Sequence, residues 1–464
     1  MTTLLLTTIL SLLINVIAQP SMVYIINRHG VIQTRDTTTY EGGALLLNTS
    51  YERLYQKGSV IRNLYPGLLS PTYKTTEVRF NSSSWERSIT TTQGIITGLY
   101  PTQNNFTANI PVYSTPWEND YTLYNYDKCP NYNTALAAFF ASAEFQNKVI
   151  YYSNLTTAIN AIVNPSTPIT LQNIYTTWNM YWLSINRPES GQTMPPISMQ
   201  LYSLLTEATN YVETKKMSVQ VAGTYFGSTL LNAIKYRTDM FIKGNTVFGH
   251  KMIMSTSHYP NILGLFASLG YTGPKSQTIP DYNAMVVFEL YNNGVGLPNG
   301  TGWSLQVKYY DGEWNNVPIN LYSLGLGSCN ESIVTSCSHD YLTFWNTYRL
   351  KNLTQFCMDC GSTLPICIGS VVSNNIGLLQ TAVNYIVSNN TVVSNNTIVY
   401  NNSEQVISIT KILSNGELHT IEGIVSSVIA MLFVVLVLNV WICTQITSRK
   451  QTLMMYNPTG SANV

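Results

Sequence analysis

The chain has 464 residues, of which 45% are hydrophobic and only 10% are charged, so it can bury a large core as one big domain or two unequal ones. Its 24 basic and 23 acidic residues give a formal net charge of +1, which argues against nucleic acid as a partner. Much of the remaining polarity comes from Tyr, Thr, Asn and Ser, and this favours an extracellular, glycosylated surface over a cytosolic one.

A leucine- and isoleucine-rich run at the start of the chain predicts a secretory signal peptide over residues 1–19, cleaved near Ala18 or Gln19. The run contains no Lys or Arg, so only the α-amino group supplies the positive charge that such signals carry. A buried N-terminal strand or helix is the alternative, and a second membrane signal near the other end of the chain disfavours it.

Apolar residues 22–26 predict a strand buried on both faces, which ends at Asn27, Arg28, His29 and Gly30. Ligands of open α/β sheets bind beyond the carboxyl ends of strands, so this position suits an anionic ligand. Arg28 offers a permanent planar cation for phosphate, and His29 offers a ring nitrogen that can attack phosphorus when neutral. On these residues alone, a hydrogen-bonded structural histidine is the more frequent explanation.

Strands and helices alternate along the rest of the chain. We expect helices at 49–64, 88–99 and 262–269, mainly helical sequence at 129–147 and 196–237, and strands at 78–80, 251–257, 284–292 and 303–311. The last two strands alternate in polarity and are expected to be antiparallel. This order predicts an α/β sheet with a helical insertion at about 129–237.

Basic groups stand at three of the predicted strands: Arg28 with His29, then Arg79, then His258. Phosphoryl transfer needs such a cluster, because the transferring group spreads negative charge over its non-bridging oxygens. One histidine can attack phosphorus while the other groups hold the charge. Chance placement of three basic groups is the alternative.

Six of the seven cysteines fall before the second membrane signal: Cys129, Cys329, Cys337, Cys357, Cys360 and Cys367. An even number in an oxidising compartment predicts disulfides. Cys357 and Cys360 have a spacing that metal sites also use, but no matching Cys or His pair completes a zinc set nearby, so we expect no metal.

Residues 387–404 repeat with a period of six, VSNNTV, VSNNTI and VYNNSE, and each unit holds one Asn-x-Ser/Thr sequon. We interpret residues 371–420 as a glycosylated stalk, with an edge strand pair or plain disorder as the alternatives.

Residues 421–443 are almost wholly apolar and predict a transmembrane helix, since their length suffices to cross a bilayer of about 30 Å. Arg449 and Lys450 follow and favour the cytoplasmic side. The chain is therefore expected to be a single-pass type I membrane protein with a cytoplasmic tail at 444–464. Its ectodomain would lie outside the cell or in the lysosomal lumen.

Four stretches resemble, in order, the landmarks of the histidine acid phosphatase family. They are Arg28-His29-Gly30, VRFNSSSWERSITTTQGIITGLYP, IPVYSTP and STSHYPNILGLFASLG. The resemblance runs from about Met22 to Cys357. It implies a mostly parallel sheet flanked by helices, with a smaller helical domain, within residues 20–370.

The resemblance also implies site residues. His29 would be the nucleophile that forms a phosphohistidine, and Arg28, Arg79 and His258 would bind the phosphoryl oxygens of a phosphomonoester or another small anion. It implies no cofactor. Two cysteine pairs follow from it, Cys129 with Cys357 and Cys329 with Cys337, which leaves Cys360 and Cys367 as a third pair.

Two positions depart from the family. In its motif Arg-His-Gly-x-Arg-x-Pro the second arginine is replaced by Ile32, and its His-Asp pair becomes His258-Tyr259. One phosphate clamp and the general acid are therefore missing. A positioned acid contributes about 10²- to 10⁴-fold, and a charged donor to the phosphoryl group contributes ~10²- to 10³-fold.

Two hypotheses follow from these losses. The chain is either a membrane-anchored acid phosphatase with weakened activity, retained best on aryl esters, or a catalytically inactive pseudophosphatase that acts as a surface binding protein. The sequence leaves the oligomeric state, monomer or homodimer, open.

Overall fold

The computed structural model describes residues 19–33, 45–101, 109–126, 129–218, 223–294, 296–312, 319–320, 338–348, 350–362, 364, 366–367, 399–402 and 405–408. The chain divides into two compact units, residues 1–376 and 377–464. In the second unit, the described residues form one antiparallel pair of strands, β9 (Val399–Asn402) and β10 (Gln405–Ser408).

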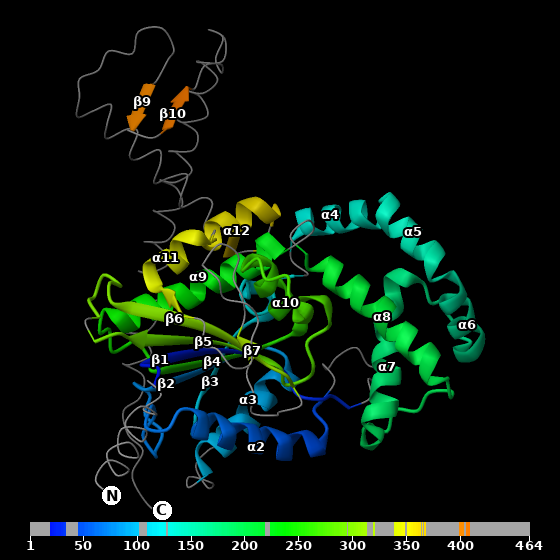
Figure 1. The fold of residues 1–464 in the computed structure, drawn as a ribbon, viewed down its shortest axis with the longest axis horizontal. Coiled ribbons are helices and arrows are strands. Elements are labelled where there is room, and N and C mark those ends of the chain that lie inside the picture. Colours follow the sequence, from blue (N-terminus) through cyan, green and yellow to red (C-terminus); the bar gives the residue numbers. More distant parts are fainter. Residues whose placement is uncertain are drawn as a thin grey trace, which may run out of the picture. The chain divides into compact units, whose positions relative to one another are not determined.

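A mixed sheet forms the centre of the first unit (Figure 1). Its strands are β1 (Met22–Arg28), β2 (Val78–Ser83), β3 (Val112–Thr115), β4 (Met252–Ser257), β5 (Met285–Asn292), β6 (Trp303–Tyr310), β7 (Ile319–Asn320) and β8 (His339–Asp340). The order is β3-β2-β4-β1-β5-β6-β7, and β8 pairs with β6. The first four strands in this order run parallel, and the pairs β1–β5, β5–β6, β6–β7 and β6–β8 are antiparallel. The expected α/β fold is confirmed, with an antiparallel part added to the parallel one.

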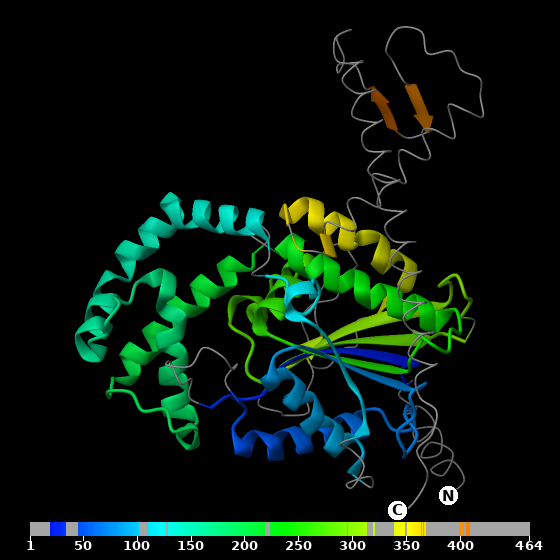
Figure 2. The ribbon, with the colours of Figure 1, turned by 180° about the vertical axis from the view of Figure 1, so that it is seen from behind.

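Helices cover both faces of this sheet (Figures 1 and 2). One face carries α2 (Asn48–Leu64) and α3 (Glu86–Leu99), and the other carries α9 (Gly223–Ile242), α10 (Tyr259–Ser268), α11 (Tyr341–Thr347) and α12 (Leu353–Cys360). Successive side chains of a strand point to opposite faces. Accordingly, Val23 and Ile25 pack in the core with α2 and α3, whereas Tyr24 and Ile26 pack in the core with α9 and α10.

Helices α2 and α3 approach each other closely because glycines face each other at their contact. A Cβ atom on Gly58 would lie 2.1 Å from the carbonyl oxygen of Ile95, and one on Gly98 would lie 1.8 Å from that of Tyr55. Side chains at these two positions would push the helices apart. The two glycines thus fix the helix pair that carries part of the candidate site.

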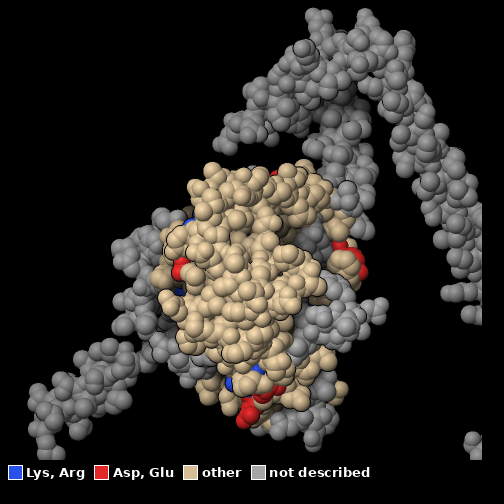
Figure 3. All heavy atoms as spheres, turned by 90° about the vertical axis from the view of Figure 1, so that its right-hand side faces the viewer, with Lys and Arg blue, Asp and Glu red and all other residues tan. Residues whose placement is uncertain are grey.

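A helical lobe stands beside the sheet (Figures 1 and 2). It contains α4 (Pro130–Ala141), α5 (Ala143–Tyr151), α6 (Ser153–Val163), α7 (Ile174–Asn186) and α8 (Met199–Lys216). Short 3-10 turns occur at η3 (Trp117–Asn119), η4 (Leu171–Asn173), η5 (Pro188–Ser190) and η6 (Pro274–Gln277). The face of the lobe seen in Figure 3 carries few charged side chains, in keeping with the low charged fraction of the sequence.

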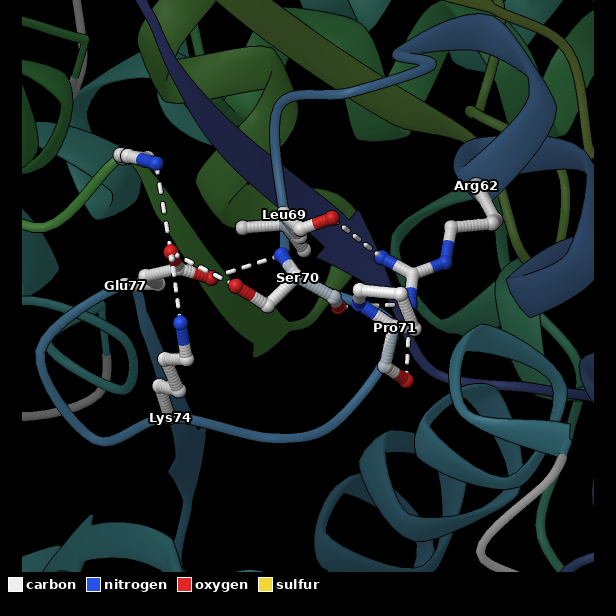
Figure 4. Close-up of polar contacts among 7 residues, drawn as sticks. Arg62, Leu69, Ser70, Pro71, Lys74 and Glu77 are labelled. Carbon is white, nitrogen blue, oxygen red and sulfur yellow. Dashed lines mark hydrogen bonds and ion pairs between the residues drawn. The ribbon is translucent and has the colours of Figure 1, made fainter.

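The connection from α2 to β2 is fixed by two charged side chains (Figure 4). Arg62 donates hydrogen bonds to the carbonyl groups of three successive residues, Leu69, Ser70 and Pro71. Glu77 accepts from the backbone and the hydroxyl of Ser70 at 2.7 and 2.9 Å, and it forms ion pairs with Lys251 and Lys74. These contacts hold the residues that lead into β2.

The cysteine pairing differs from the expected one. Cys129 bonds to Cys360, and Cys357 bonds to Cys367, so the predictions Cys129–Cys357 and Cys360–Cys367 are wrong. The start of α4 lies beside the last residues of α12, where the Asn131 amide donates to the Asp359 carbonyl at 2.7 Å, and this brings Cys129 to the end of that helix. The predicted pair Cys329–Cys337 lies outside the described residues.

The predicted membrane and export segments also lie outside the described residues. This holds for residues 1–18, for the span at 421–443 and for the tail at 444–464. In the described part of the chain, no helix combines the length and the apolar character needed to cross a membrane.

Candidate active site

The parallel pairing of β1 and β4 brings His29 and His258 together. Arg28 and Ser257, the last residues of the two strands, lie opposite each other, and the His29 backbone N–H donates to the Ser257 carbonyl at 3.1 Å. The two imidazole rings lie with their centroids 5.2 Å apart. His29 and His258 are far apart in the sequence, but the parallel pairing brings both to the carboxyl edge of the sheet. Ligands of such sheets bind at this edge.

His29 is held as a neutral ring whose Nε2 carries a lone pair. Its Nδ1 lies 2.9 Å from the Gly30 carbonyl, which can only accept, so Nδ1 carries the proton. Burial, together with the positive charge of Arg87, lowers the pKa of His29 well below its usual value. The Gly30 N–H donates to Thr91 on α3 at 2.8 Å and fixes the turn after the strand.

Arg87, in the first turn of α3, lies between the two histidines. Its Nε donates to Nε2 of His29 at 3.4 Å, and its terminal nitrogen Nη2 lies 3.4 Å from Nδ1 of His258. The guanidinium also lies over the ring of Trp85, 4.8 Å from its centroid. Arg87 is absent from the sequence prediction. The sequence does hold a sign of it, because a helix that begins just after a strand offers an anion site at its N-terminus.

Arg79 does not join this cluster, which corrects the prediction. In the sheet it lies opposite Ile253, as does Tyr24, and therefore stands level with the middle of β1 and not with its end. Strand β2 continues to Ser83, four residues beyond Arg79, so the carboxyl end of the strand carries Ser83.

His258 is neutral and oriented as well. Its Nδ1 faces the Arg87 donor, so Nε2 carries the proton and donates to the Ser83 hydroxyl at 3.0 Å. Burial, followed by the charges of Arg87 and Arg28, lowers the pKa of His258 well below its usual value. The residue also caps the N-terminus of α10, which fixes its backbone.

Arg28 completes the cluster from the last position of β1. Its side chain is 2% exposed and donates to the carbonyl of Pro280. The guanidinium lies between two tyrosines, 3.9 Å from the ring centroid of Tyr282 and 5.2 Å from that of Tyr259. Tyr282 also contacts the ring of His29, with centroids 5.5 Å apart.

The structure places Ile32 and Tyr259, the two residues at which the sequence is expected to depart from the family motif. Ile32 is buried among apolar side chains that include Val31 and Leu47. The hydroxyl of Tyr259 donates to Glu213 at 2.7 Å, and burial together with the charge of Glu213 raises the pKa of this phenol well above its usual value. Tyr259 therefore keeps its proton and directs it at a carboxylate.

A cavity of about 720 Å³ is lined in part by Tyr282, whose ring also contacts His29. Its wall includes Arg53 and Lys57 from α2 and Arg187 from the end of α7. Lys57 is buried and donates to the side chain of Asn27 and the carbonyl of Asn283. Burial lowers the pKa of Lys57 to about 7. The cavity wall thus carries the two guanidinium groups of Arg53 and Arg187 and also the carboxylate of Asp281.

Comparison with known proteins assigns the chain to a family. The sequence profile of the histidine phosphatase superfamily (branch 2) matches residues 31–309. Bovine lysosomal acid phosphatase is 23% identical over 356 residues, which cover 71% of this chain and 77% of that protein. Human prostatic acid phosphatase is 22% identical over 316 residues, which cover 64% of this chain and 76% of that protein.

Solved structures show the same fold. The phytase of Klebsiella sp. ASR1 aligns with 71% of this chain and 94% of its own, with a TM-score of 0.52 and 14% identity. The apo phytase of Hafnia alvei aligns with 71% of this chain and 95% of its own, with a TM-score of 0.51 and 13% identity. Since the profile spans more than half of the chain and both strand-end histidines lie together as described, the chain belongs to the histidine phosphatase superfamily, branch 2, as a member of its histidine acid phosphatase family.

Proposed function

We propose that the chain is a phosphomonoesterase that works through a phosphohistidine at His29. One observation carries this proposal. The Arg87 guanidinium lies between two neutral histidines, and the lone pair on Nε2 of His29 points at it. A phosphoryl group placed there would find a nucleophile and a permanent cation within one hydrogen-bond length of each other.

The reaction would take two steps. In the first, Nε2 attacks phosphorus and the bond from phosphorus to the ester oxygen breaks, so the alcohol leaves as its anion unless it is protonated. In the second, water attacks the phosphohistidine and releases phosphate, and Nε2 regains its lone pair. Arg28, Arg87 and His258 would hold the phosphoryl oxygens in both steps.

The leaving group decides the efficiency. Tyr259 occupies the position of the family's acid, but its proton is bonded to Glu213. Aryl esters, whose phenolates leave without help, would be hydrolysed faster than alkyl esters, by about the 10²- to 10⁴-fold that a positioned acid supplies.

Purified protein would be assayed on 4-nitrophenyl phosphate and on glycerol 2-phosphate, with His29→Ala as the test variant. His339→Gln serves as the matched control, since His339 is also a buried histidine but lies on β8. We expect His29→Ala to abolish turnover and His339→Gln to preserve it, with an acid-labile phosphoryl label trapped only when His29 is present. Equal activity of His29→Ala and the unaltered chain on both esters would reject the enzymatic proposal.

A second candidate is an inactive anion-binding protein of the same fold. The burial of the cluster favours it, because Arg28, His29, Arg87 and His258 are 2%, 5%, 8% and 3% exposed and the ring of Tyr282 contacts both Arg28 and His29. In that case phosphate would bind and protect the fold, but neither ester would be turned over.

We also propose that this domain is displayed on a membrane. The support is the sequence pattern of residues 1–19 and 421–443 and the two disulfides, which suit an oxidising compartment. Fractionation of cells that express the full chain tests this: carbonate-resistant membrane association is expected, and a chain truncated before residue 421 should appear in the medium.

A further inference from the structure

The four groups of the candidate active site are covered by other side chains. Arg28, His29, Arg87 and His258 are at most 8% exposed. An anion can therefore bind them only if a side chain that covers them moves. Aromatic rings contact all four groups, and one ring, that of Tyr282, contacts two of them. Tyr282 is thus the first side chain to consider as the cover of the nucleophile.

The Tyr282 ring lies against both Arg28 and His29. Its centroid lies 3.9 Å from the guanidinium carbon of Arg28 and 5.5 Å from the centroid of the His29 ring. The face of a tyrosine ring attracts a cation, but charge-assisted hydrogen bonds to a phosphate dianion attract it more strongly. A phosphate group that reaches Arg28 therefore competes with the ring for the same guanidinium.

Tyr282 also lines the cavity of about 720 Å³. Trp182 lines this cavity as well and contacts the Tyr282 ring, with the two centroids 5.2 Å apart. Protein interiors are otherwise close-packed, so a buried ring can change its rotamer only where such a space lies beside it. The cavity gives the Tyr282 ring a volume into which it can turn.

The backbone at Tyr282 is fixed, so a movement of this residue is confined to its side chain. The backbone N–H of the next residue, Asn283, donates to the His29 carbonyl at 3.2 Å. A Cβ atom on Gly312 would lie 1.8 Å from the Tyr282 carbonyl oxygen, so the chain that follows β6 packs directly on this carbonyl.

A hydrogen bond from the helical lobe holds the ring in its position. The Tyr282 hydroxyl donates to the side-chain oxygen of Asn179 on α7 at 2.8 Å, and we call this bond the latch. Within the part of the chain that the structure describes, it is the single hydrogen bond of that hydroxyl. A hydrogen bond between neutral groups contributes little on balance, so a dianion that binds Arg28 can break the latch.

We propose that Tyr282 is a gate over His29, which Asn179 latches and which turns into the cavity when a phosphate group binds Arg28. This inference rests on the proposed phosphate site at His29 and adds to it the residue that controls entry. Phosphate binds only the fraction of chains whose ring has turned away. The apparent dissociation constant is then the intrinsic constant divided by that fraction. Loss of the latch raises the fraction and therefore tightens phosphate binding.

The test is calorimetric titration of the full chain with inorganic phosphate. Tyr282→Phe and Asn179→Ala should each bind phosphate about 2- to 10-fold more tightly than the unaltered chain, the shift that the loss of one neutral hydrogen bond gives. The double variant should match the single ones, because both substitutions remove the same bond. Tyr152→Phe is the matched control and should bind as the unaltered chain does, since the Tyr152 hydroxyl is also bonded within the lobe, to Glu207 at 2.8 Å.

Phosphate binding that appears only when the latch is removed would also support the gate. Affinities that are unchanged in both single variants, gains that add in the double variant, or no phosphate binding by any of these proteins would overturn it.

Tryptophan fluorescence gives a readout that a merely structural role of Tyr282 would not move. Trp182 contacts the Tyr282 ring, so phosphate should change the fluorescence of the chain, and Trp182→Phe should remove at least part of that change. An identical change in Trp182→Phe would contradict the movement of the ring. Both readouts measure binding, whereas the His29→Ala assay measures turnover. A chain that binds phosphate as expected but hydrolyses neither ester would keep the gate and reject the enzyme alone.

Discussion

The Nε atom of Arg87 lies 3.4 Å from Nε2 of His29, so a residue in the first turn of α3 supplies the cation that faces the proposed nucleophile. Ile32, three residues after His29, is buried among apolar side chains. The positive charge of the site is therefore built from Arg28 and Arg87.

Replacing Arg87 with Gln should lower kcat/KM for 4-nitrophenyl phosphate by about 10²- to 10³-fold, because a charged donor to the phosphoryl oxygens is lost. Arg79→Gln, the matched change on β2, should alter kcat/KM by less than about twofold, since Arg79 lies level with Tyr24. Steady-state kinetics on folded protein, checked by circular dichroism, decide between them. A large loss in Arg79→Gln with a small one in Arg87→Gln would contradict this assignment.

The sequence was sufficient to predict that His29 and His258 meet, because both follow apolar strands and parallel strands end at one edge of a sheet. It misplaced Arg79, because the strand expected at 78–80 runs on to Ser83 and so ends later. Arg87 was missed, since a residue one turn into a helix reaches the site only through the packing of that helix. The disulfides were mispaired because Cys357 and Cys360 share α12, and only the position of α4 selects between them.

Tyr259→Asp should restore turnover of alkyl phosphates if the missing acid limits the reaction. Tyr259→Asn is the matched control, because it creates the same cavity and equally removes the hydroxyl bonded to Glu213, but it supplies no proton. We expect the Asp variant to hydrolyse glycerol 2-phosphate about 10²-fold or more faster than the Asn variant, and the two to differ little on 4-nitrophenyl phosphate. Equal rates of both variants on the alkyl ester would mean that the lack of an acid does not limit the reaction. The limit would then lie in the missing arginine at position 32 or in the burial of the cluster.

Glu77 should make the stability of the fold depend on pH in the acid range. Burial opposes its ionised form, but hydrogen bonds from Ser70 and the nearby Lys251 outweigh this and lower the pKa of Glu77. The stabilisation is therefore complete above the pKa of the unfolded chain and is lost as pH falls through the pKa of the folded one. Urea unfolding of Glu77→Gln should show a deficit of about 1 to 2 kcal/mol at neutral pH that shrinks on acidification. A deficit that stays constant with pH would mean that the charge of Glu77 contributes nothing.

Lys57 should make the stability of the fold rise with pH in the alkaline range. Its pKa is lowered by burial to about 7 in the folded chain, below the value of about 10.4 that a lysine has when unfolded. Between these two values the unfolded chain binds one more proton, so the stability that Lys57 contributes must rise with pH, by up to about 1.4 kcal/mol per unit. Lys57→Met removes the titrating group, and Lys57→Gln keeps a polar group for Asn27 and Asn283. Urea unfolding from about pH 7 to pH 10 should show the unaltered chain gaining stability relative to both variants. Parallel curves for all three proteins would show that Lys57 keeps an ordinary pKa and remains charged in the cavity wall.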